Sequence, residues 1–228
     1  MQRNIITTAD GSKTIHLVEW NEHYHSIHGA IQEANHVFIK HGLLFFMETI
    51  PEVRPINILE IGFGTGLNAF ITLLVAEKSN VAIDYVGVEA FPISSDELSA
   101  LNYSDQIDIK RSHEFASLHS IPLDEKHTIN SHFSLTKRQQ FFEQIEDKDC
   151  YNLIYFDAFG ARVQPELWTE GIFTKMYSAL KPNGVLVTYS AKGSVRRAML
   201  KVGFTVEKLP GPPGKREMLR ASKYSANL

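Results

Sequence analysis

The stretch that most constrains the fold of this chain is "INILEIGFGTGLNAF" at residues 56–70. Its apolar first half ends in an acid, Glu60, and three glycines then occupy alternate positions: Gly62, Gly64 and Gly66. The apolar run predicts a buried strand, and the apolar residues after the glycines predict a helix. Glycine adopts positive φ and lets a ligand approach the main chain where a Cβ would block it. The stretch therefore predicts a strand, a bare ligand-binding turn and a helix.

The rest of the chain continues this alternation of strands and helices. Apolar strands are predicted over 82–91, 132–139, 151–159 and 184–190, and helices over 94–103, 139–146, 165–180 and 193–204. Two strands in quick succession, 205–209 and 216–221, predict an antiparallel hairpin at one edge. The sequence therefore predicts an α/β fold with a doubly wound, mostly parallel sheet that helices cover on both faces.

The first quarter of the chain differs from this pattern. Residues 4–18 predict a hairpin around Asp10-Gly11, and apolar residues at helical spacing follow from Ile31. We expect residues 1–55 to form an N-terminal extension, a hairpin plus a helix, that packs on a main domain of residues 56–228. Residues 105–130 are poorly periodic and predict an irregular insertion.

Composition narrows the cellular setting. The single cysteine, Cys150, excludes an internal disulfide and fits a reducing cytoplasm. The N-terminus has no apolar signal region, and the longest apolar run, 42–47, is too short to span a bilayer. Six of ten histidines lie between His16 and His41, without the cysteines or acids of a recognisable ligand set. We expect a cytoplasmic protein with no membrane partner and no metal.

The charge is unevenly distributed along the chain. The net charge is −3, but residues 190–228 carry nine Lys/Arg against two Glu, a balance of +7. The remaining residues then carry −10, which indicates a basic patch on an acidic body. Such a patch suits phosphate groups, and a solvated C-terminal surface is the alternative.

The glycine spacing and two acids narrow the class of ligand. Dinucleotide sites use G-x-G-x-x-G, whereas this turn reads G-x-G-x-G, so a dehydrogenase is the least favoured enzyme. Glu60 would repel a pyrophosphate but suits a cofactor that carries an ammonium and a sulfonium. Glu89 ends the next strand, where it can accept hydrogen bonds from a ribose diol. Acid, bare turn and second acid together resemble the S-adenosylmethionine site of class I methyltransferases.

Asp157, in "YFDAF", is the third acid at a strand end and lies near the end of the strand predicted over 151–159. A carboxylate at that position of a doubly wound sheet is typical of a catalytic acid or base. An amine that accepts a methyl group must first lose its proton, and a carboxylate can orient the amine and take that proton. Phe159 and Trp168 suit apolar walls that stack on a base, or else are ordinary core aromatics.

Six segments occur in an order that resembles one known family. They are "NEHYHSIHGAIQEANHVFI", "EIGFGTGLNAF", "YVGVEAFP", "YFDAFGARVQPELW", "SAKGSVRRAMLKVGF" and "PGKREML", and they span about residues 19–221. Together they resemble the methyltransferase domain of the MnmC family, or its stand-alone form MnmD. The resemblance implies a seven-stranded, Rossmann-like class I methyltransferase. It also implies S-adenosyl-L-methionine-dependent N-methylation of 5-aminomethyl-2-thiouridine at the wobble position of tRNA, giving 5-methylaminomethyl-2-thiouridine.

The resemblance also implies partners and residue roles. The partner would be the anticodon stem-loop of tRNA, and a separate enzyme would supply the aminomethyl group, since no oxidase domain follows in this chain. Asp157 and Phe159 would lie beside the acceptor. Cofactor contacts would come from Tyr24, Ser26, Gly29, Glu33, Glu60, Gly62, Gly64, Gly66, Asn68, Glu89, Ala90 and Asp157. Contacts with tRNA would come from Trp168, Lys192, Arg196, Arg197, Lys215 and Arg216.

The chain departs from the family pattern at two places. The family's D-G-F-A-P motif reads Asp157-Ala158-Phe159-Gly160-Ala161, without the proline. The segment "HFSLTKRQQ" lacks the acid that often follows this strand in class I methyltransferases, so the residue that contacts adenine is unassigned.

Other functions remain open from the sequence. A small-molecule amine methyltransferase, or an aminopropyltransferase similar to spermidine synthases, would keep the glycine turn and Asp157 but take another acceptor. The basic tail favours RNA, because a polyamine calls for an acidic pocket. A non-catalytic scaffold would have no use for six intact site residues: Glu60, Gly62, Gly64, Gly66, Glu89 and Asp157.

Overall fold

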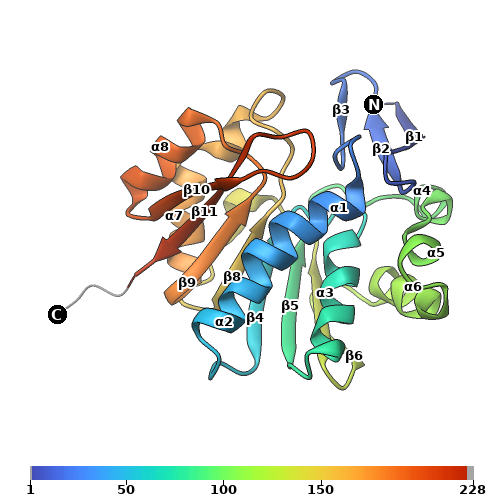
Figure 1. Ribbon diagram of the computed structural model, residues 1–228, viewed down its shortest axis with the longest axis horizontal. Coiled ribbons are helices and arrows are strands. Elements are labelled where there is room, and N and C mark those ends of the chain that lie inside the picture. The colour runs from blue at the N-terminus through green and yellow to red at the C-terminus, as the bar shows by residue number, and fades with distance from the viewer. Residues whose placement is uncertain (1, 225–228) are drawn as a thin grey trace.

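A computed structural model describes residues 2–224. The chain begins with a small antiparallel sheet of β1 (Arg3–Thr7), β2 (Lys13–Leu17) and β3 (Glu22–His23). The predicted hairpin is confirmed, since β1 pairs with β2 across the Asp10-Gly11 turn. Figure 1 shows this small sheet standing beside the upper end of the main sheet.

The main sheet has eight strands in the order β10-β11-β9-β8-β4-β5-β7-β6. Strands β4, β5, β7, β8 and β9 run parallel, whereas β11 runs antiparallel to both β9 and β10, and β6 runs antiparallel to β7. The strands are β4 (Ile56–Ile61), β5 (Ile83–Val88), β6 (Lys126–Asn130), β7 (Phe133–Arg138), β8 (Tyr151–Phe156), β9 (Leu180–Thr188), β10 (Thr205–Pro210) and β11 (Glu217–Lys223). The predicted doubly wound, mostly parallel sheet is confirmed. Its strand order reverses between β4 and β8, which is where such sheets bind ligands.

Helices cover both faces of this sheet (Figure 1). On one face lie α1 (Ala30–Ala34), the π-helical η1 (Asn35–Leu44), α2 (Phe45–Thr49), α3 (Leu67–Lys78) and α6 (Ser112–Ser120), around the core of Phe38, Phe70 and Tyr155. On the other lie α7 (Glu170–Ala179) and α8 (Gly193–Val202), around the core of Phe156 and Phe173. Tyr155 and Phe156 are neighbours in β8 and belong to opposite cores, as the two-residue period of a strand requires. Shorter elements are α4 (Ser95–Ala100), α5 (Tyr103–Ile107), η2 (Ile109–Arg111), η3 (Phe142–Gln144) and η4 (Pro165–Trp168).

Two expectations about secondary structure are wrong. Residues 105–130 are not irregular, because they contain most of α5, all of α6 and the edge strand β6. Only Glu114, Phe115 and Leu118 of α6 are buried, so serines and histidines hide its helical period. The helix predicted over 139–146 is the single 3₁₀ turn η3. Within residues 2–224, no helix combines the length and the apolar content that a membrane crossing needs.

Candidate active site

The glycine turn between β4 and α3 holds a shape that other residues cannot easily adopt. Gly62, Gly64 and Gly66 have φ values of 91°, 49° and 72°. A Cβ at Gly62 would lie 2.7 Å from the carbonyl oxygen of Asp157, and a Cβ at Gly66 would lie 2.7 Å from Nε2 of His119. Both distances are too short for a real Cβ contact. The glycines therefore let the turn after β4 lie against the turn after β8 on one side and against α6 on the other.

Glu89, after β5, is tied to the same turn. Its Oε2 accepts a hydrogen bond from the Gly64 N–H (3.1 Å), and its Oε1 accepts one from the Phe91 N–H (2.9 Å). Burial raises the pKa of this carboxyl above its ordinary value. Glu89 thus stands at a fixed place beside the glycine turn, where the sequence predicted a ribose contact.

A cavity of about 600 Å³ opens where β4, β5 and β8 end. The predicted site residues that line it are Tyr24, Gly62, Gly64, Glu89, Ala90, Asp157 and Phe159. Its volume lies within the range of sites for drug-sized ligands and cofactors. The structure therefore brings together residues from the N-terminal hairpin and from three strand ends around one cavity.

Asn68 joins two carboxyl groups beneath this cavity. Its Nδ2 donates to Oδ2 of Asp157 (2.8 Å) and to Oε1 of Glu60 (2.9 Å). Glu60 is 0% exposed and lines none of the cavities described, and burial raises its pKa well above the ordinary value. The predicted direct contact of Glu60 or Asn68 with a cofactor does not fit this burial. Asn68 instead orients Asp157, and Glu60 in turn holds the Asn68 amide.

Asp157 has the pKa of a group that titrates near neutrality. Burial is the main cause and the nearby Glu33 carboxylate adds to it, whereas the hydrogen bond from Asn68 and the charge of Lys215 oppose it. The result is a pKa raised to about 7. A carboxyl with such a pKa can take up and release a proton at the pH of the cell.

A second cavity, of about 230 Å³, lies on the other side of Asp157. It shares five residues with the larger cavity: Tyr24, His25, Asp157, Ala158 and Phe159. Glu33 and Lys215 form an ion pair in its wall, and the Lys215 ammonium lies 3.9 Å from the centroid of the Tyr189 ring. This cavity therefore offers the Glu33 carboxylate and the Lys215 ammonium next to Asp157.

Ser26 and Gly29 shape this second cavity by different means. Ser26 lines it, and its N–H donates to Oε2 of Glu33 (2.8 Å). Gly29 lines neither cavity, so the predicted direct contact with a cofactor does not fit its place. It has a φ of 139° and precedes α1, and a Cβ there would lie 2.7 Å from Oδ2 of Asp10. Gly29 is needed for the turn that brings Glu33 into the wall.

Two residues predicted to contact RNA point inward. Lys215 is engaged by Glu33 and Tyr189, so its charge does not serve tRNA phosphates. Trp168 is 5% exposed, and its indole N–H donates to the carbonyl oxygen of Phe159 (2.7 Å). Its ring therefore does not face an RNA base, and it supports the loop that carries Phe159.

Ion pairs also offset part of the positive charge of the basic tail, residues 190–228. Five of its nine cations pair with acids: Lys201 with Glu170, Lys208 with Glu217, Lys215 with Glu33, Arg220 with Glu207 and Lys223 with Asp149. Three of those acids lie outside the tail in the sequence but next to it in the fold. Positive charge is therefore less concentrated in space than it is along the chain. Within residues 2–224, no acid pairs with the other four: Lys192, Arg196, Arg197 and Arg216. All four are exposed except Arg196, which is half-buried.

The sequence did not identify several residues that line the larger cavity. Phe91 and Phe141 are 60% and 51% exposed at its rim, with ring centroids 5.8 Å apart in an edge-to-face arrangement. Glu143, on η3, is an acid after β7 that the sequence placed inside a helix. Trp20 comes from the β2–β3 turn and gave no local signal, because only the folded hairpin brings it to the cavity.

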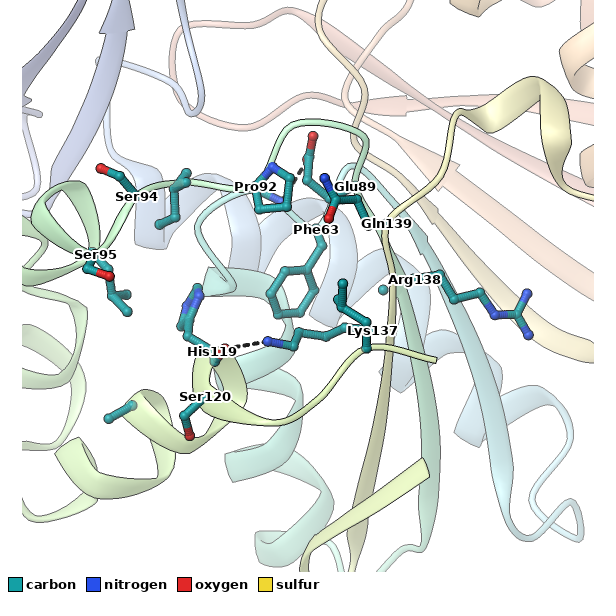
Figure 2. Close-up of a pocket in the computed structure, with 16 residues that line it drawn as sticks. Phe63, Glu89, Pro92, Ser94, Ser95, His119, Ser120, Lys137, Arg138 and Gln139 are labelled. Atoms are coloured by element: carbon teal, nitrogen blue, oxygen red, sulfur yellow. Dashed lines mark hydrogen bonds between the residues drawn. The ribbon is translucent and has the colours of Figure 1, made fainter. Parts of the chain in front are cut away.

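A third cavity, of about 280 Å³, lies behind the glycine turn (Figure 2). Phe63 separates it from the larger cavity, and a Cβ at Gly87 would overlap the Phe63 ring. His119 of α6 lines it and donates from Nε2 to the Thr65 carbonyl (3.1 Å), while the Lys137 ammonium bonds the His119 carbonyl. Burial, with the charge of Lys137, lowers the pKa of His119 to about 4. His119 is therefore a neutral support for the turn.

Three of the N-terminal histidines, His23, His25 and His28, line the smaller cavity together with Glu22, Glu33 and Asp157. His16 and His23 stack with centroids 4.5 Å apart, and His25 bonds Oγ1 of Thr65 at 2.7 Å. Among the described residues, no group of three His, Cys, Asp or Glu side chains converges to hold a metal ion.

Comparison with known proteins gives this site a chemical context. Residues 109–224 match the family model described as S-adenosyl-L-methionine-dependent methyltransferase. The tRNA 5-methylaminomethyl-2-thiouridine biosynthesis bifunctional protein MnmC of Hydrogenovibrio crunogenus is 29% identical over 205 residues, which cover 86% of this chain and 30% of that protein. The MnmC protein of Pseudomonas entomophila is 29% identical over 222 residues, covering 90% and 33%. The chain spans about a third of the length of these relatives.

Solved structures give the same picture of the fold. The crystal structure of MnmC2 from Aquifex aeolicus superposes with a TM-score of 0.79 at 27% identity, covering 99% of this chain and 71% of that chain. A spermidine synthase in complex with the transition-state analogue AdoDATO has a TM-score of 0.62 at 16% identity, covering 97% and 70%. The second likeness concerns the fold alone.

Proposed function

Because the chain belongs to the family of S-adenosyl-L-methionine-dependent methyltransferases, we propose that it methylates the amine of 5-aminomethyl-2-thiouridine at the wobble position of tRNA. One observation carries the proposal: Asp157, with a pKa of about 7, lies where the two cavities meet. A base at that place serves an amine acceptor, which must be deprotonated before it takes a methyl group. The MnmC relatives support tRNA as the substrate.

The residues present fit the cofactor. S-adenosylmethionine supplies an electrophilic methyl group on a sulfonium. We propose that Glu89 holds the ribose hydroxyls and that Phe91 and Phe141 hold the adenine. The amino-acid end would occupy the smaller cavity, where Glu33 suits its ammonium and Lys215 suits its carboxylate. The ion pair between the half-buried Lys215 and the buried Glu33 has the same two charges as that end of the cofactor.

The chain's own groups would then prepare the acceptor. Asp157 takes the proton of the acceptor ammonium and orients the amine, while Asn68 fixes the carboxylate oxygen that faces away. Phe159 packs beside the base, on a loop that Trp168 supports from the core. With the acceptor bound, Phe159 and the neighbouring aromatic rings would exclude water, which strengthens these electrostatic contacts.

The direct test is methyl transfer from labelled S-adenosylmethionine to tRNA that carries 5-aminomethyl-2-thiouridine, read by mass spectrometry of the nucleosides. We expect label in the wobble nucleoside only, and none in tRNA that lacks the aminomethyl group. A small-molecule amine is the second candidate acceptor, because three carboxylates surround the smaller cavity: Glu22, Glu33 and Asp157. Transfer to polyamines, with none to tRNA, would establish that candidate instead.

Replacing Lys215 with Gln is expected to weaken S-adenosylmethionine binding about tenfold to a hundredfold, because a charge-assisted contact to the carboxylate is lost. Decarboxylated S-adenosylmethionine should bind both proteins equally, since it lacks that group. Calorimetry with each ligand measures the difference. Lys208→Gln, which alters a half-exposed ion pair on the same hairpin, is the matched control. Equal loss for both ligands would mean that Lys215 only supports the loop.

Replacing Lys192, Arg197 and Arg216 with Gln is expected to weaken tRNA binding and to flatten its salt dependence. Each phosphate contact contributes about 0.7–0.9 to the slope of log K against log salt, so the slope should fall by about two to three. Filter binding at several salt concentrations measures it. Lys201→Gln, whose charge is already paired with Glu170, should leave the slope unchanged. An unchanged slope in the triple variant would remove these residues from the RNA surface.

The proposed substrate implies an earlier reaction. An aminomethyl group must already stand on the base, so we propose that a separate enzyme installs it. We also propose a cytoplasmic location, which a tRNA substrate and the exposed free thiol of Cys150 support.

A further inference from the structure

Two aromatic clusters line the larger cavity. Phe91 and Phe141 follow β5 and β7, whereas Trp20 and Tyr24 pack edge-to-face against Phe159, two residues after Asp157 in the loop after β8. In the sheet order, β4 separates β5 and β7 from β8. The cofactor contains a single aromatic ring system, its adenine, which the first cluster accommodates. The second cluster lies at the reactive end, where the other ligand must enter.

Trp20 differs from an ordinary core tryptophan. It is half-buried and lines the cavity, and among the described residues its one ring contact is with Phe159, at 5.9 Å between centroids and 82° between planes. Within residues 2–224, no hydrogen bond engages its indole N–H. By contrast, Trp168 is buried against Phe156 and Phe173, and its N–H is bonded. Trp20 therefore presents aromatic surface that the folded chain does not use.

Arg162 fixes the turn that carries Trp20. One guanidinium nitrogen, Nη2, donates to the carbonyl oxygens of Trp20 and Asn21, both at 2.9 Å, and to the Glu22 carboxylate at 3.0 Å. Arg162 lies in the segment that begins with Asp157 and Phe159. The bonds therefore connect the β2–β3 turn to the loop that bears the reactive carboxylate, and they set the place of Trp20 relative to it.

We propose that Trp20 is the platform on which the acceptor base stacks, and that Arg162 is the residue that positions it. The proposal rests on the proposed function, in which the acceptor is a pyrimidine with an amine arm. To bring that arm to Asp157, the base must leave its stack in the anticodon loop, and an unstacked base gains most from a fixed aromatic face. Phe159 would then pack beside the aminomethyl group of the stacked base.

Fluorescence tests the contact without relying on activity. The chain has two tryptophans, Trp20 and Trp168, and the second is buried. An anticodon stem-loop with 5-aminomethyl-2-thiouridine should quench wild-type emission in the presence of S-adenosylhomocysteine. Trp20→Phe should abolish the quench while the stem-loop still binds. A stem-loop with an abasic wobble position should bind through its phosphates and cause no quench in the wild type.

Kinetics test the role of both residues. Trp20→Ala should lower kcat/KM for tRNA methylation about tenfold or more, as for other base–aromatic stacks, and Trp20→Phe should lose less than about threefold. Cofactor affinity by calorimetry should stay within about twofold for both. Arg162→Ala should lower kcat/KM and the quench amplitude together. The double variant should lose little more than the larger single loss, because the two residues act as one unit.

The outcomes separate the proposal from its premise. Wild-type methylation of tRNA together with an unaffected Trp20→Ala rate, or a quench that persists in Trp20→Phe, overturns the platform alone. Loss of cofactor affinity in Trp20→Ala that matches the loss of kcat/KM would make Trp20 a wall of the cofactor cavity and also overturn it. No methylation and no quench with the wild type would overturn the proposed function as well.

Discussion

Asp157→Asn is expected to lower kcat for methyl transfer by a factor of about 10² to 10⁴, the usual contribution of a general base. Asparagine keeps the size of the side chain and can still accept the hydrogen bond that Asn68 donates at 2.8 Å. Affinity for S-adenosylmethionine should therefore change less than about threefold. Single-turnover rates and calorimetry on the same preparation measure both quantities. A parallel fall of rate and affinity would place Asp157 in the cofactor site instead of beside the acceptor.

The pH dependence of the same variant follows from the raised pKa. In the wild type, kcat/KM should rise as the pH passes about 7, because Asp157 must be ionised to accept a proton. The Asp157→Asn profile should lack that step.

Through Asp157, the stability of the wild-type protein should fall with rising pH, whereas its kcat/KM should rise. The folded-state pKa of about 7 lies above the ordinary 3.8, so the folded protein holds an extra proton between those values. The stability from this group is therefore lost as the pH rises through 7. The melting temperature of Asp157→Asn, relative to wild type, should increase from pH 5 to pH 8, and a constant difference would contradict the buried carboxyl.

Gly62→Ala is expected to weaken cofactor binding by about a hundredfold or more. A residue with a Cβ is strained at the φ of 91° found there, by roughly 1–3 kcal/mol. The added Cβ would also lie 2.7 Å from the Asp157 carbonyl oxygen and force the two turns apart. Calorimetry with S-adenosylmethionine measures the loss, and circular dichroism checks that the variant is folded.

Gly171→Ala is the matched control for that change. Gly171 is exposed on α7, and an added Cβ would make an ordinary contact of 3.7 Å with Oγ1 of Thr169. Alanine is favoured over glycine within a helix, by about 0.5–1 kcal/mol, so this variant should be slightly more stable and bind normally. Normal binding by Gly62→Ala as well would show that the close approach of the two turns is dispensable.

The parts of the fold that strong local patterns specify could be predicted from the sequence. The helix predicted after the glycine turn is present as α3, and both predicted hairpins are present. The apolar period and the glycines act within a few residues, so they can be identified in a linear chain. In α6 only three residues are buried, and its signal was too weak.

Local patterns predicted a site residue only where it acts at its own strand end or glycine turn, whereas Tyr24, Ser26 and Glu33 were predicted through the family resemblance alone. Glu89 and Asp157 stand at the cavity because the ends of parallel strands share one edge. Lys215 was misassigned because its partner, Glu33, lies 182 residues earlier in the chain. Glu60, like Glu89, lies near the end of an apolar strand in the sequence, but its side chain is buried beneath the cavity. These differences depend on tertiary contacts, which no local pattern contains.

The support beneath the glycine turn has an energetic consequence. Three glycines in five residues form one of the most flexible segments a chain can have, and ordering it by a ligand would cost conformational entropy. Contacts within the protein already restrain this segment. The Asp157 main chain lies against Gly62, His119 donates to the Thr65 carbonyl, and His25 bonds the Thr65 hydroxyl. The conformational entropy of the glycine turn is therefore lost when the protein folds, not when a ligand binds. What the cofactor gains from its contacts then remains available as affinity.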